Sequence, residues 1–418
     1  MSKRQTLAET DSEPMTEIGL ALRAITEHLA AELHSPRPKA PDWSDFQWRI
    51  AKAVAAMQGI SSLLSTRLLW TGPAHWNRFL QEQRDHVAGR CQKIERLLET
   101  IDEYSRRYGI ALIGLKGTAL LKRALYRPGD RPMADIDLLV LGDDVPGTTR
   151  LLQNCGFDLT FTTWRHHLFE VARSGLAPTI SRLGEHVDNP IKIELHTAIR
   201  ERLPVSEIDI TAFVRRDAIP PGLNSYSSAA SLMMHLVLHA AGNMRAHALR
   251  LIQLYDIALL AESFSALDWE DLTCAYQDPS EIWWALPPLS MVERYFPGSI
   301  PPSVIASLAE HCPWWLRRAT GSQNLADVSW TNLRVYAFPG IEWSRTPTEV
   351  LRLVRARLLP DAETRMELLR FSSHHPGASK IPWYGISQGK RILRWVFLKP
   401  PRVQALLPVR AALAERVD

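Results

Sequence analysis

The segment from Ile113 to Val140, which reads IGLKGTALLKRALYRPGDRPMADIDLLV, constrains the fold of this chain more than any other. Its residue pattern predicts a strand, a tight turn, a helix, a loop and a second strand. Gly114 and Gly117 bracket the turn, and a glycine at position 117 lets backbone N–H groups approach an anion at the start of the helix. The segment therefore predicts an anion-binding turn between a strand and a helix.

Two carboxylates stand at the start of the second strand of this segment. Asp135 and Asp137 are separated by one residue, so on a strand their side chains point to the same face. Two carboxylates side by side repel each other unless a cation neutralises them. Mg²⁺ (or Mn²⁺) suits such a pair, because a hard cation takes oxygen ligands and leaves positions open for phosphate oxygens and water. The pair is a candidate metal site.

A later strand, IKIELHTAI, supplies a third carboxylate, Glu194. Its alternation places Lys192, Glu194 and His196 on one face and apolar residues on the other. Enzymes that transfer phosphoryl groups often use a second metal ion about 3.5–4 Å from the first, which requires a further carboxylate on a neighbouring strand. We expect Glu194 to complete such a site with the two aspartates.

Three further residues are candidates for contact with phosphate groups. Lys116 and Thr118 flank Gly117 and offer an ammonium group and a hydroxyl. Arg131 lies shortly before the aspartates, where its guanidinium either contacts a triphosphate or pairs with Asp130 or Asp135. The sequence leaves these two roles open.

Hydrophobic spacing along the chain predicts a small α/β or α+β domain in the middle of the chain, with helical regions before and after it. Short β-rich runs are confined to the middle of the chain, whereas helical spacing dominates on both sides. We predict a disordered tail over residues 1–15, an N-terminal helical region over 16–108, a core over 109–222 and a helical C-terminal domain over 223–418.

Two helix boundaries carry local signals. In SLMMHLVLHAAG, Gly242 is placed as a C-cap that would end the helix. In TPTEVLRLVRARLLP, Thr346 and Glu349 stand at capping-box spacing and Pro347 occupies the first helical position.

Polar residues within the C-terminal helical pattern need partners. His235 and His239 are one helical turn apart, but no Glu follows His235 as a zinc protease helix would require, so core or site-lining histidines are expected. Asp256 lies within an apolar face, where an unpaired carboxylate is costly to bury, and we expect a partner such as Arg250 or His239.

Charge and cysteine content narrow the class of protein. Lys and Arg number 49 against 45 Asp and Glu, so the small basic excess does not indicate a surface built to coat nucleic acid. The four cysteines are far apart and predict reduced thiols rather than a zinc module or disulfide framework: Cys91, Cys155, Cys274 and Cys312. The sequence shows neither a signal peptide nor a transmembrane segment, so we expect a cytoplasmic protein.

The glycine turn, the D-x-D strand and the later strand carboxylate resemble the DNA polymerase β-like nucleotidyltransferase superfamily. More narrowly, KGTALL, RPMADIDLLV and IELH look like a bacterial group described as uncharacterised nucleotidyltransferase family proteins. This resemblance implies an α+β fold with a mixed β-sheet core flanked by helices. It also implies an NTP as co-substrate, Mg²⁺ as cofactor, and transfer of a nucleoside monophosphate with release of pyrophosphate. It covers residues 110–200 well and continues weakly into RLIQLYDIA.

On this interpretation Asp135, Asp137 and Glu194 are the catalytic metal ligands, and Lys116, Gly117, Thr118 and Arg131 bind the nucleotide. The acceptor is open between a small molecule, a peptide or protein, and tRNA. Neither the preferred NTP nor the oligomeric state can be read from the sequence. Two alternatives remain: a non-catalytic nucleotide-sensing or partner-binding protein, and a toxin-like enzyme that modifies tRNA.

Overall fold

The computed structural model describes residues 15–172, 183–215, 219–275, 279–362, 364–366, 387–398 and 401–414. Residues 1–14 of the predicted tail lie outside this part of the chain. Met15, placed in that tail by the sequence analysis, is the first residue of helix α1 (Met15–His34).

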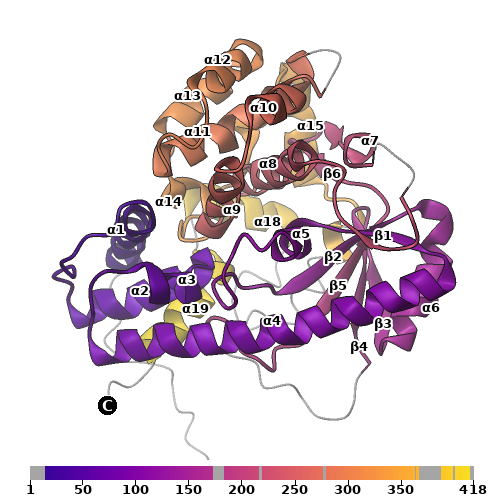
Figure 1. The fold of residues 1–418 in the computed structure, drawn as a ribbon. Coiled ribbons are helices and arrows are strands. Elements are labelled where there is room, and N and C mark those ends of the chain that lie inside the picture. The colour runs from indigo at the N-terminus through magenta and orange to yellow at the C-terminus, as the bar shows by residue number, and fades with distance from the viewer. Residues whose placement is uncertain are drawn as a thin grey trace, which may run out of the picture.

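A six-stranded mixed sheet lies at the centre of the α+β fold, as predicted (Figure 1). Its strand order is β3–β4–β5–β2–β1–β8, and β2 pairs with β5 in parallel and with β1 in antiparallel orientation. The strands are β1 (Ala111–Gly114), β2 (Asp135–Val140), β3 (Phe157–Thr162), β4 (His166–Val171), β5 (Lys192–His196) and β8 (Gly222–Asn224). A separate hairpin consists of β6 (Arg200–Arg202) and β7 (Glu207–Asp209).

Two helices cover one face of the sheet. The long helix α4 (Ala74–Tyr108) runs along it and ends at Gly109, which has the left-handed φ of 69° that favours glycine (Figure 1). Helix α6 (Val145–Asn154) lies beside α4. Apolar side chains of α4 and α6 pack in one buried cluster with Ile136, Leu138 and Ile193. Because strand residues alternate between faces, this packing leaves Asp135, Asp137 and Glu194 on the opposite face.

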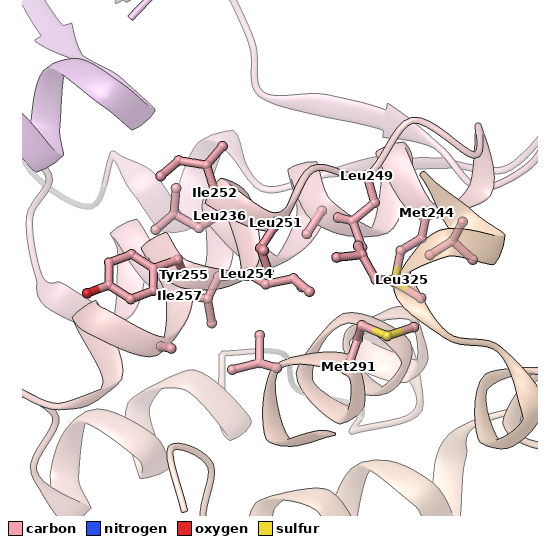
Figure 2. Close-up of a cluster of buried hydrophobic side chains, with 14 of the residues drawn as sticks. Leu236, Met244, Leu249, Leu251, Ile252, Leu254, Tyr255, Ile257, Met291 and Leu325 are labelled. Atoms are coloured by element: carbon pink, nitrogen blue, oxygen red, sulfur yellow. The ribbon is translucent and has the colours of Figure 1, made fainter. Parts of the chain in front are cut away.

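Helices of the C-terminal half lie over that opposite face (Figure 1). They begin with α8 (Ala229–Arg245) and α9 (Leu251–Ala261), which pack against each other and against α11 (Leu286–Tyr295). Figure 2 shows this contact, where Leu254 and Leu251 of α9 lie near Met291 of α11. The apolar residues of these helices are almost all buried, so the packing fixes the position of α8 and α9 over the sheet.

The remaining described elements are short or lie at the periphery. Around the sheet they are α2 (Asp45–Gln58), α3 (Ser61–Arg67), α5 (Lys116–Lys122), η1 (Gly142–Asp144) and α7 (Thr211–Val214). In the C-terminal half they are α10 (Ala266–Thr273), η2 (Pro279–Ala285), α12 (Pro302–His311), α13 (Trp314–Ser322), α14 (Leu325–Val328), η3 (Ile341–Trp343), α15 (Pro347–Leu358), α18 (Gln388–Phe397) and α19 (Val403–Ala414).

One buried hydrophobic cluster continues through all three predicted parts of the chain. It includes Leu22 of α1, Leu120 of α5, Leu254 of α9 and Val409 of α19. The last helix, α19, packs against α2, so the end of the described chain returns to the N-terminal helices (Figure 1). The predicted core boundary after residue 222 falls inside strand β8. The division into three domains remains a prediction.

The two helix-boundary predictions have different outcomes. The prediction that Gly242 ends its helix is wrong, because α8 continues to Arg245. A Cβ at position 242 would lie 2.7 Å from a carboxylate oxygen of Glu201, so the glycine provides room for that side chain. Thr346 caps α15 as predicted, but the Glu349 carboxylate accepts from the backbone N–H of Arg345 instead of the N–H of Thr346.

No helix in the described part of the chain is both long and apolar enough to cross a membrane. The four cysteines are free thiols, and burial raises the pKa of the Cys91 thiol to about 11 and that of Cys312 to about 12.

Candidate functional site

A cavity of about 350 Å³ lies between the polar face of the sheet and helices α8 and α9. Residues from β2, β4 and β5 line one side, and His235, His239, Arg250 and Asp256 line the other. Asp135, Asp137, Glu194, Lys116, Gly117 and Arg131 are all in its wall. Of the seven predicted site residues, the structure thus brings six to one cavity.

Strand pairing explains why the carboxylates meet. In the parallel pair of β2 and β5, Asp137 is directly opposite Glu194, and Asp135 is opposite Lys192. Residues that are opposite in register share a face of the sheet. Asp137 and Glu194, separated by 57 positions in the chain, therefore become neighbours.

Lys116 neutralises Asp137 directly, with its Nζ 2.7 Å from Asp137 Oδ1. The backbone of Lys116 has a φ of 41°, in the left-handed region that a lysine adopts only when its surroundings hold it there. Its N–H donates to the hydroxyl oxygen of Tyr226 at 3.2 Å, and that hydroxyl lies 2.6 Å from Nδ1 of His235 on α8. Helix α8 thereby supports the turn that presents the lysine.

The three carboxylates differ in their affinity for protons. Burial alone would raise the pKa of Asp137, but Lys116 and His196 outweigh burial and hold that pKa well below its usual range. Burial, followed by the charge of Asp137, raises the pKa of Asp135. The same two causes raise the pKa of Glu194 to about 8. Two of the three carboxylates consequently lack sufficient positive charge around them.

This donor set fits a divalent cation. Asp135, Asp137 and Glu194 offer only hard oxygen ligands, and their buried location makes uncompensated negative charge costly. Lys116, Arg131 and Arg250 all favour ionised Asp135, but together they do not outweigh burial and the charge of Asp137. The residues present are therefore suited to hold Mg²⁺ or Mn²⁺, which would stabilise the ionised carboxylates.

Arg131 has neither of the protein partners considered from the sequence. Its Nε and Nη2 donate to the two carboxylate oxygens of Asp256 on α9, each at 2.7 Å, and Tyr126 donates to the same carboxylate at 2.7 Å. Asp130 pairs with Arg84 instead. The predicted partners of Asp256, Arg250 or His239, are likewise wrong. A bidentate pair holds the guanidinium at a fixed angle, so Arg131 connects the loop before β2 to α9.

Gly117 is required by the position of Arg131. A Cβ at residue 117 would lie 2.8 Å from Arg131 Nη1 and 3.3 Å from Met133 Cγ. The absence of a side chain leaves the backbone at the start of α5 open toward the cavity, as the turn prediction supposed.

Thr118 is the predicted residue that does not reach the cavity. Only 1% of its surface is exposed, its Oγ1 has no hydrogen-bond partner in the described part of the chain, and it is not part of the cavity wall. Its methyl group packs toward Gly114, where an added Cβ would lie 2.6 Å away. The Thr118 side chain thus packs against β1, so its predicted contact with phosphate lacks geometric support in this conformation.

Arg250 lines the cavity, a position that the sequence analysis did not predict. Its Nε donates to the carbonyl of Met57 at 3.1 Å, while no carboxylate in the described part of the chain forms a salt bridge with it. Burial lowers the pKa of this guanidinium, and the charges of Glu185 and Asp135 act in the opposite direction. A largely buried arginine without an anionic partner at the cavity wall is available to a phosphate group.

His235 and His239 line the cavity, in agreement with the expectation of core or site-lining histidines. His235 bonds Tyr226, and His239 Nε2 lies 3.1 Å from the side-chain amide of Asn243. Burial, followed by the positive charge of Lys116, holds the pKa of both imidazoles well below the usual value. Both are therefore neutral at pH 7.

His166 is a further site residue that the sequence did not predict. Strand β4 pairs with β5 so that His166 is opposite His196 and Leu168 is opposite Glu194. His166, Glu194 and His196 have ligand atoms that all lie within 4.8 Å of one another. No local motif marks His166, because its proximity to Glu194 arises only from the antiparallel pairing of β4 with β5.

Comparison of the sequence with known proteins identifies the family of this chain. A family model described as "Uncharacterised nucleotidyltransferase" matches residues 44–278, which is more than half of the chain. No curated protein and no solved structure matches the chain. The matched range contains every strand of the sheet, the three carboxylates and the helices α8 and α9 that close the cavity. The chain therefore belongs to the family of uncharacterised nucleotidyltransferases, as its sequence motifs indicate.

Proposed function

We propose that the protein transfers a nucleoside monophosphate from an NTP to an acceptor, with release of pyrophosphate, in a reaction that depends on Mg²⁺ or Mn²⁺. The observation that carries this proposal is the convergence of Asp135, Asp137 and Glu194 on one face of adjacent strands, at a cavity also lined by Lys116, Arg131 and Arg250. Three carboxylates beside three cationic side chains suit a substrate that consists of phosphate groups and divalent metal.

In this proposal Asp135, Asp137 and Glu194 hold the metal. Bound metal would lower the pKa of the acceptor hydroxyl and neutralise charge on the phosphates. The residues of the chain itself position the substrate. The open backbone at Gly117 and the ammonium group of Lys116 would contact the β- and γ-phosphates, while Arg250 would supply donors from the opposite wall.

Arg131 has a different role in this scheme. Asp256 binds two of its nitrogen atoms, and the third, Nη1, lies beside Gly117 and donates only a long hydrogen bond of 3.4 Å to the carbonyl of Pro132. We propose that Arg131 chiefly fixes the phosphate-binding turn against α9 and offers a single donor to the nucleotide. The acceptor is left open between a small molecule, a peptide or protein, and tRNA, and the cytoplasmic location remains a prediction.

The test compares wild type with Asp135→Asn and Asp137→Asn, and uses Asp158→Asn on the same sheet as the matched control. Asp158 is exposed on β3, outside the cavity wall. Binding of ATP, GTP, CTP and UTP is measured by titration calorimetry with Mg²⁺. Transfer is measured with α-labelled NTP in cell extract separated into small-molecule, protein and RNA fractions.

We expect wild type and Asp158→Asn to bind at least one NTP, release pyrophosphate and label one fraction, while the two cavity variants remain folded and lose transfer by at least 100-fold, a typical cost of removing an electrostatic catalytic group. Transfer by Asp135→Asn at the wild-type rate would refute the assigned site. If the protein binds an NTP but releases pyrophosphate with none of the three fractions, the non-catalytic alternative would be favoured.

A further inference from the structure

The strand residues next to the catalytic carboxylates form a second set of ligand atoms, which contains nitrogen. His166 Nδ1 lies 3.5 Å from Glu194 Oε2, and His196 Nε2 lies 3.7 Å from the same oxygen. His196 Nε2 also lies 3.0 Å from Asp137 Oδ1. Three strands thus direct two imidazoles and two carboxylates toward one another.

These separations match a coordination polyhedron. Four ligand atoms placed about 2.0–2.1 Å from a tetrahedral Zn²⁺ lie about 3.3–3.4 Å from one another. Three of the six separations among the four proposed ligand atoms are 3.0, 3.5 and 3.7 Å, which bracket that value. The ligand atoms of His166, Glu194 and His196 all lie within 4.8 Å of one another, so a small movement of the side chains would complete the polyhedron. The two imidazole rings meet edge to face, with centroids 5.4 Å apart, so neither ring covers the nitrogen of the other.

His166 gives an independent indication of a missing ligand. Its Nδ1 is buried and has no hydrogen-bond partner in the described part of the chain, although it faces Glu194. A buried polar atom without a hydrogen bond is uncommon and calls for an explanation such as a bound ion. The opposite face of β4 provides a contrast, because His167 Nδ1 lies 3.0 Å from Thr162 Oγ1.

We propose that His166, Glu194 and His196, with an oxygen of Asp137, form a site for a divalent transition-metal ion of the Zn²⁺ class. This refines the proposed function, because Glu194 would then hold the second ion, while Asp135 and Asp137 would hold Mg²⁺ and Asp137 would be shared between the two positions. Imidazole nitrogen is a good ligand for Zn²⁺ and Co²⁺, whereas Mg²⁺ takes oxygen ligands and releases its water reluctantly. This inference rests on the proposed function for its catalytic meaning, but binding of the ion does not require a nucleotide.

The ligand set also predicts how such a site would be used. His166, Glu194 and His196 would be three firm ligands, and the Asp137 oxygen, which Lys116 also binds, would be the fourth. A hydroxyl group could then bind by replacing that oxygen or as a fifth ligand, as in zinc sites that activate a water or hydroxyl group. The acceptor hydroxyl is the group that needs activation in nucleotidyl transfer. The site therefore belongs on the acceptor side of the cavity, where Arg165 and Glu201 also line the wall.

Titration with Co²⁺ tests the proposal, because four- and five-coordinate Co²⁺ absorbs visible light far more strongly than six-coordinate Co²⁺. The full-length protein is freed of metal with EDTA, dialysed and titrated without nucleotide. The variants are His166→Gln and His196→Gln, and His167→Gln on the same strand is the matched control. Near-UV circular dichroism establishes that each variant retains the packing of wild type.

We expect wild type and His167→Gln to bind Co²⁺ with an intense visible band that excess Mg²⁺ does not remove and that Zn²⁺ abolishes by displacement. His166→Gln and His196→Gln should bind Co²⁺ at least tenfold more weakly and lose the intensity. A faint six-coordinate spectrum in wild type, an unchanged spectrum in folded His166→Gln, or displacement by equimolar Mg²⁺ would overturn the proposal.

Asp135→Asn separates this inference from the proposed function. Asp135 is not among the four proposed ligands, so the variant should keep the Co²⁺ spectrum while it loses NTP binding in the presence of Mg²⁺. An intense Co²⁺ spectrum in a wild-type protein that binds no NTP would support this inference and refute the proposed function. A wild-type protein that binds an NTP but shows no intense Co²⁺ spectrum would support the proposed function and refute this inference.

Discussion

The carboxylate of Asp137 is held between two different partners, the ammonium group of Lys116 and the imidazole of His196. Both contacts are to the same oxygen, Oδ1. Together they keep Asp137 ionised despite its burial, whereas Asp135 and Glu194 hold protons more tightly than usual. The site thus contains one carboxylate whose pKa is lowered and two whose pKa values are raised, so the charge of the latter two depends on what binds beside them.

Substitution of Lys116 should therefore be costly mainly when no metal is present. Removing one partner from a buried ion pair typically costs about 3–5 kcal/mol, because the other charge is left uncompensated. We expect Lys116→Gln to lower the free energy of unfolding by about that amount and Mg²⁺ to restore more stability to this variant than to wild type. Urea denaturation with and without Mg²⁺ measures both effects.

Lys192→Gln is the control for that experiment. Its Nζ forms a more exposed pair with Glu170 at 3.0 Å. Exposed pairs contribute about 0–1 kcal/mol, so this substitution should have little effect. Equal losses in the two variants would contradict the view that Lys116 compensates a buried charge.

The raised pKa of Glu194 predicts a pH dependence. Because the pKa in the metal-free fold is about 8 instead of the usual 4.5, the fold binds a proton more tightly than the unfolded chain does. The resulting stabilisation is fully present below about pH 4.5 and is lost as the pH rises through about 8. A cation prefers the ionised carboxylate, so Mg²⁺ should raise the melting temperature more at about pH 9 than at about pH 6.

Thermal denaturation with and without Mg²⁺ across this range checks the prediction. Glu194→Gln cannot ionise and should show a smaller increase in Mg²⁺ stabilisation with pH. The same steep increase in both proteins would show that another group is responsible.

At the scale of elements, α8 and α9 support the turn at Lys116 and Gly117. His235 of α8 contacts the hydroxyl of Tyr226, which precedes α8 and accepts from the Lys116 N–H. Asp256 of α9 binds Arg131, whose Nη1 lies beside Gly117. The turn and these helices are separated by more than a hundred residues in the sequence. A substitution in α9 should therefore alter the proposed nucleotide site without a direct contact to the nucleotide.

The Arg131–Asp256 pair tests this coupling. We expect Asp256→Asn to lower the free energy of unfolding by about 3–5 kcal/mol, because it leaves Arg131 buried without its carboxylate. In a double-mutant cycle with Arg131→Gln, the coupling energy should exceed about 2 kcal/mol, within the range for residues in direct contact. Denaturant unfolding of the four proteins gives this value.

The exposed pair of Arg107 and Glu103 on α4, at 3.0 Å, is the comparison. Helix pairs of this kind couple by about 0.3–0.5 kcal/mol. A coupling that small for Arg131 and Asp256 would mean that the pair does not join the turn to α9.

The elements that the sequence predicted are those with strong periodicity. The strand that begins at Asp135, the strand that contains Glu194 and the helices α8 and α9 all follow from apolar spacing. The three-residue strands β6, β7 and β8 were not recognised individually, because three residues carry too little pattern. Gly242 was misread because the same residue type that ends helices also makes room for a neighbouring side chain.

The site residues that the sequence predicted also differ from those it missed in how much local pattern marks them. Asp135, Asp137 and Glu194 could be proposed because strand alternation and local motifs are visible in one segment. His166 and the Arg131–Asp256 pair could not, because they depend on which strand and which helix become neighbours. Thr118 shows the opposite failure, since its residue type fits the motif while its side chain packs against β1.

At the scale of the whole molecule, the buried cluster that joins α1, the sheet and α19 predicts a single cooperative unfolding transition. Val409 of α19 is 1% exposed. It is more than 150 residues away in the sequence from the last residue of the cavity wall, Asp256. We expect Val409→Asp to lower the melting temperature of the entire protein in one transition, since an uncompensated buried charge costs about 3–5 kcal/mol.

Arg410→Asp, at the exposed neighbouring position, is the control and should leave the transition almost unchanged. Calorimetry measures both variants. Two separate transitions, of which only one moves in Val409→Asp, would contradict the single cooperative unit and favour the predicted division into domains.

The register of β2 against β5 has a consequence for how the gene can vary. Since successive strand residues point to opposite faces, inserting or deleting a single codon inside either strand would turn Asp137 and Glu194 away from each other while leaving each residue in place in its motif. An insertion at the exposed Gly156 between α6 and β3 would preserve the pairing. Length variation among relatives that keep the three carboxylates should accordingly be confined to the connections, and single-codon insertions or deletions that separate Asp137 or Glu194 from its paired position should abolish function.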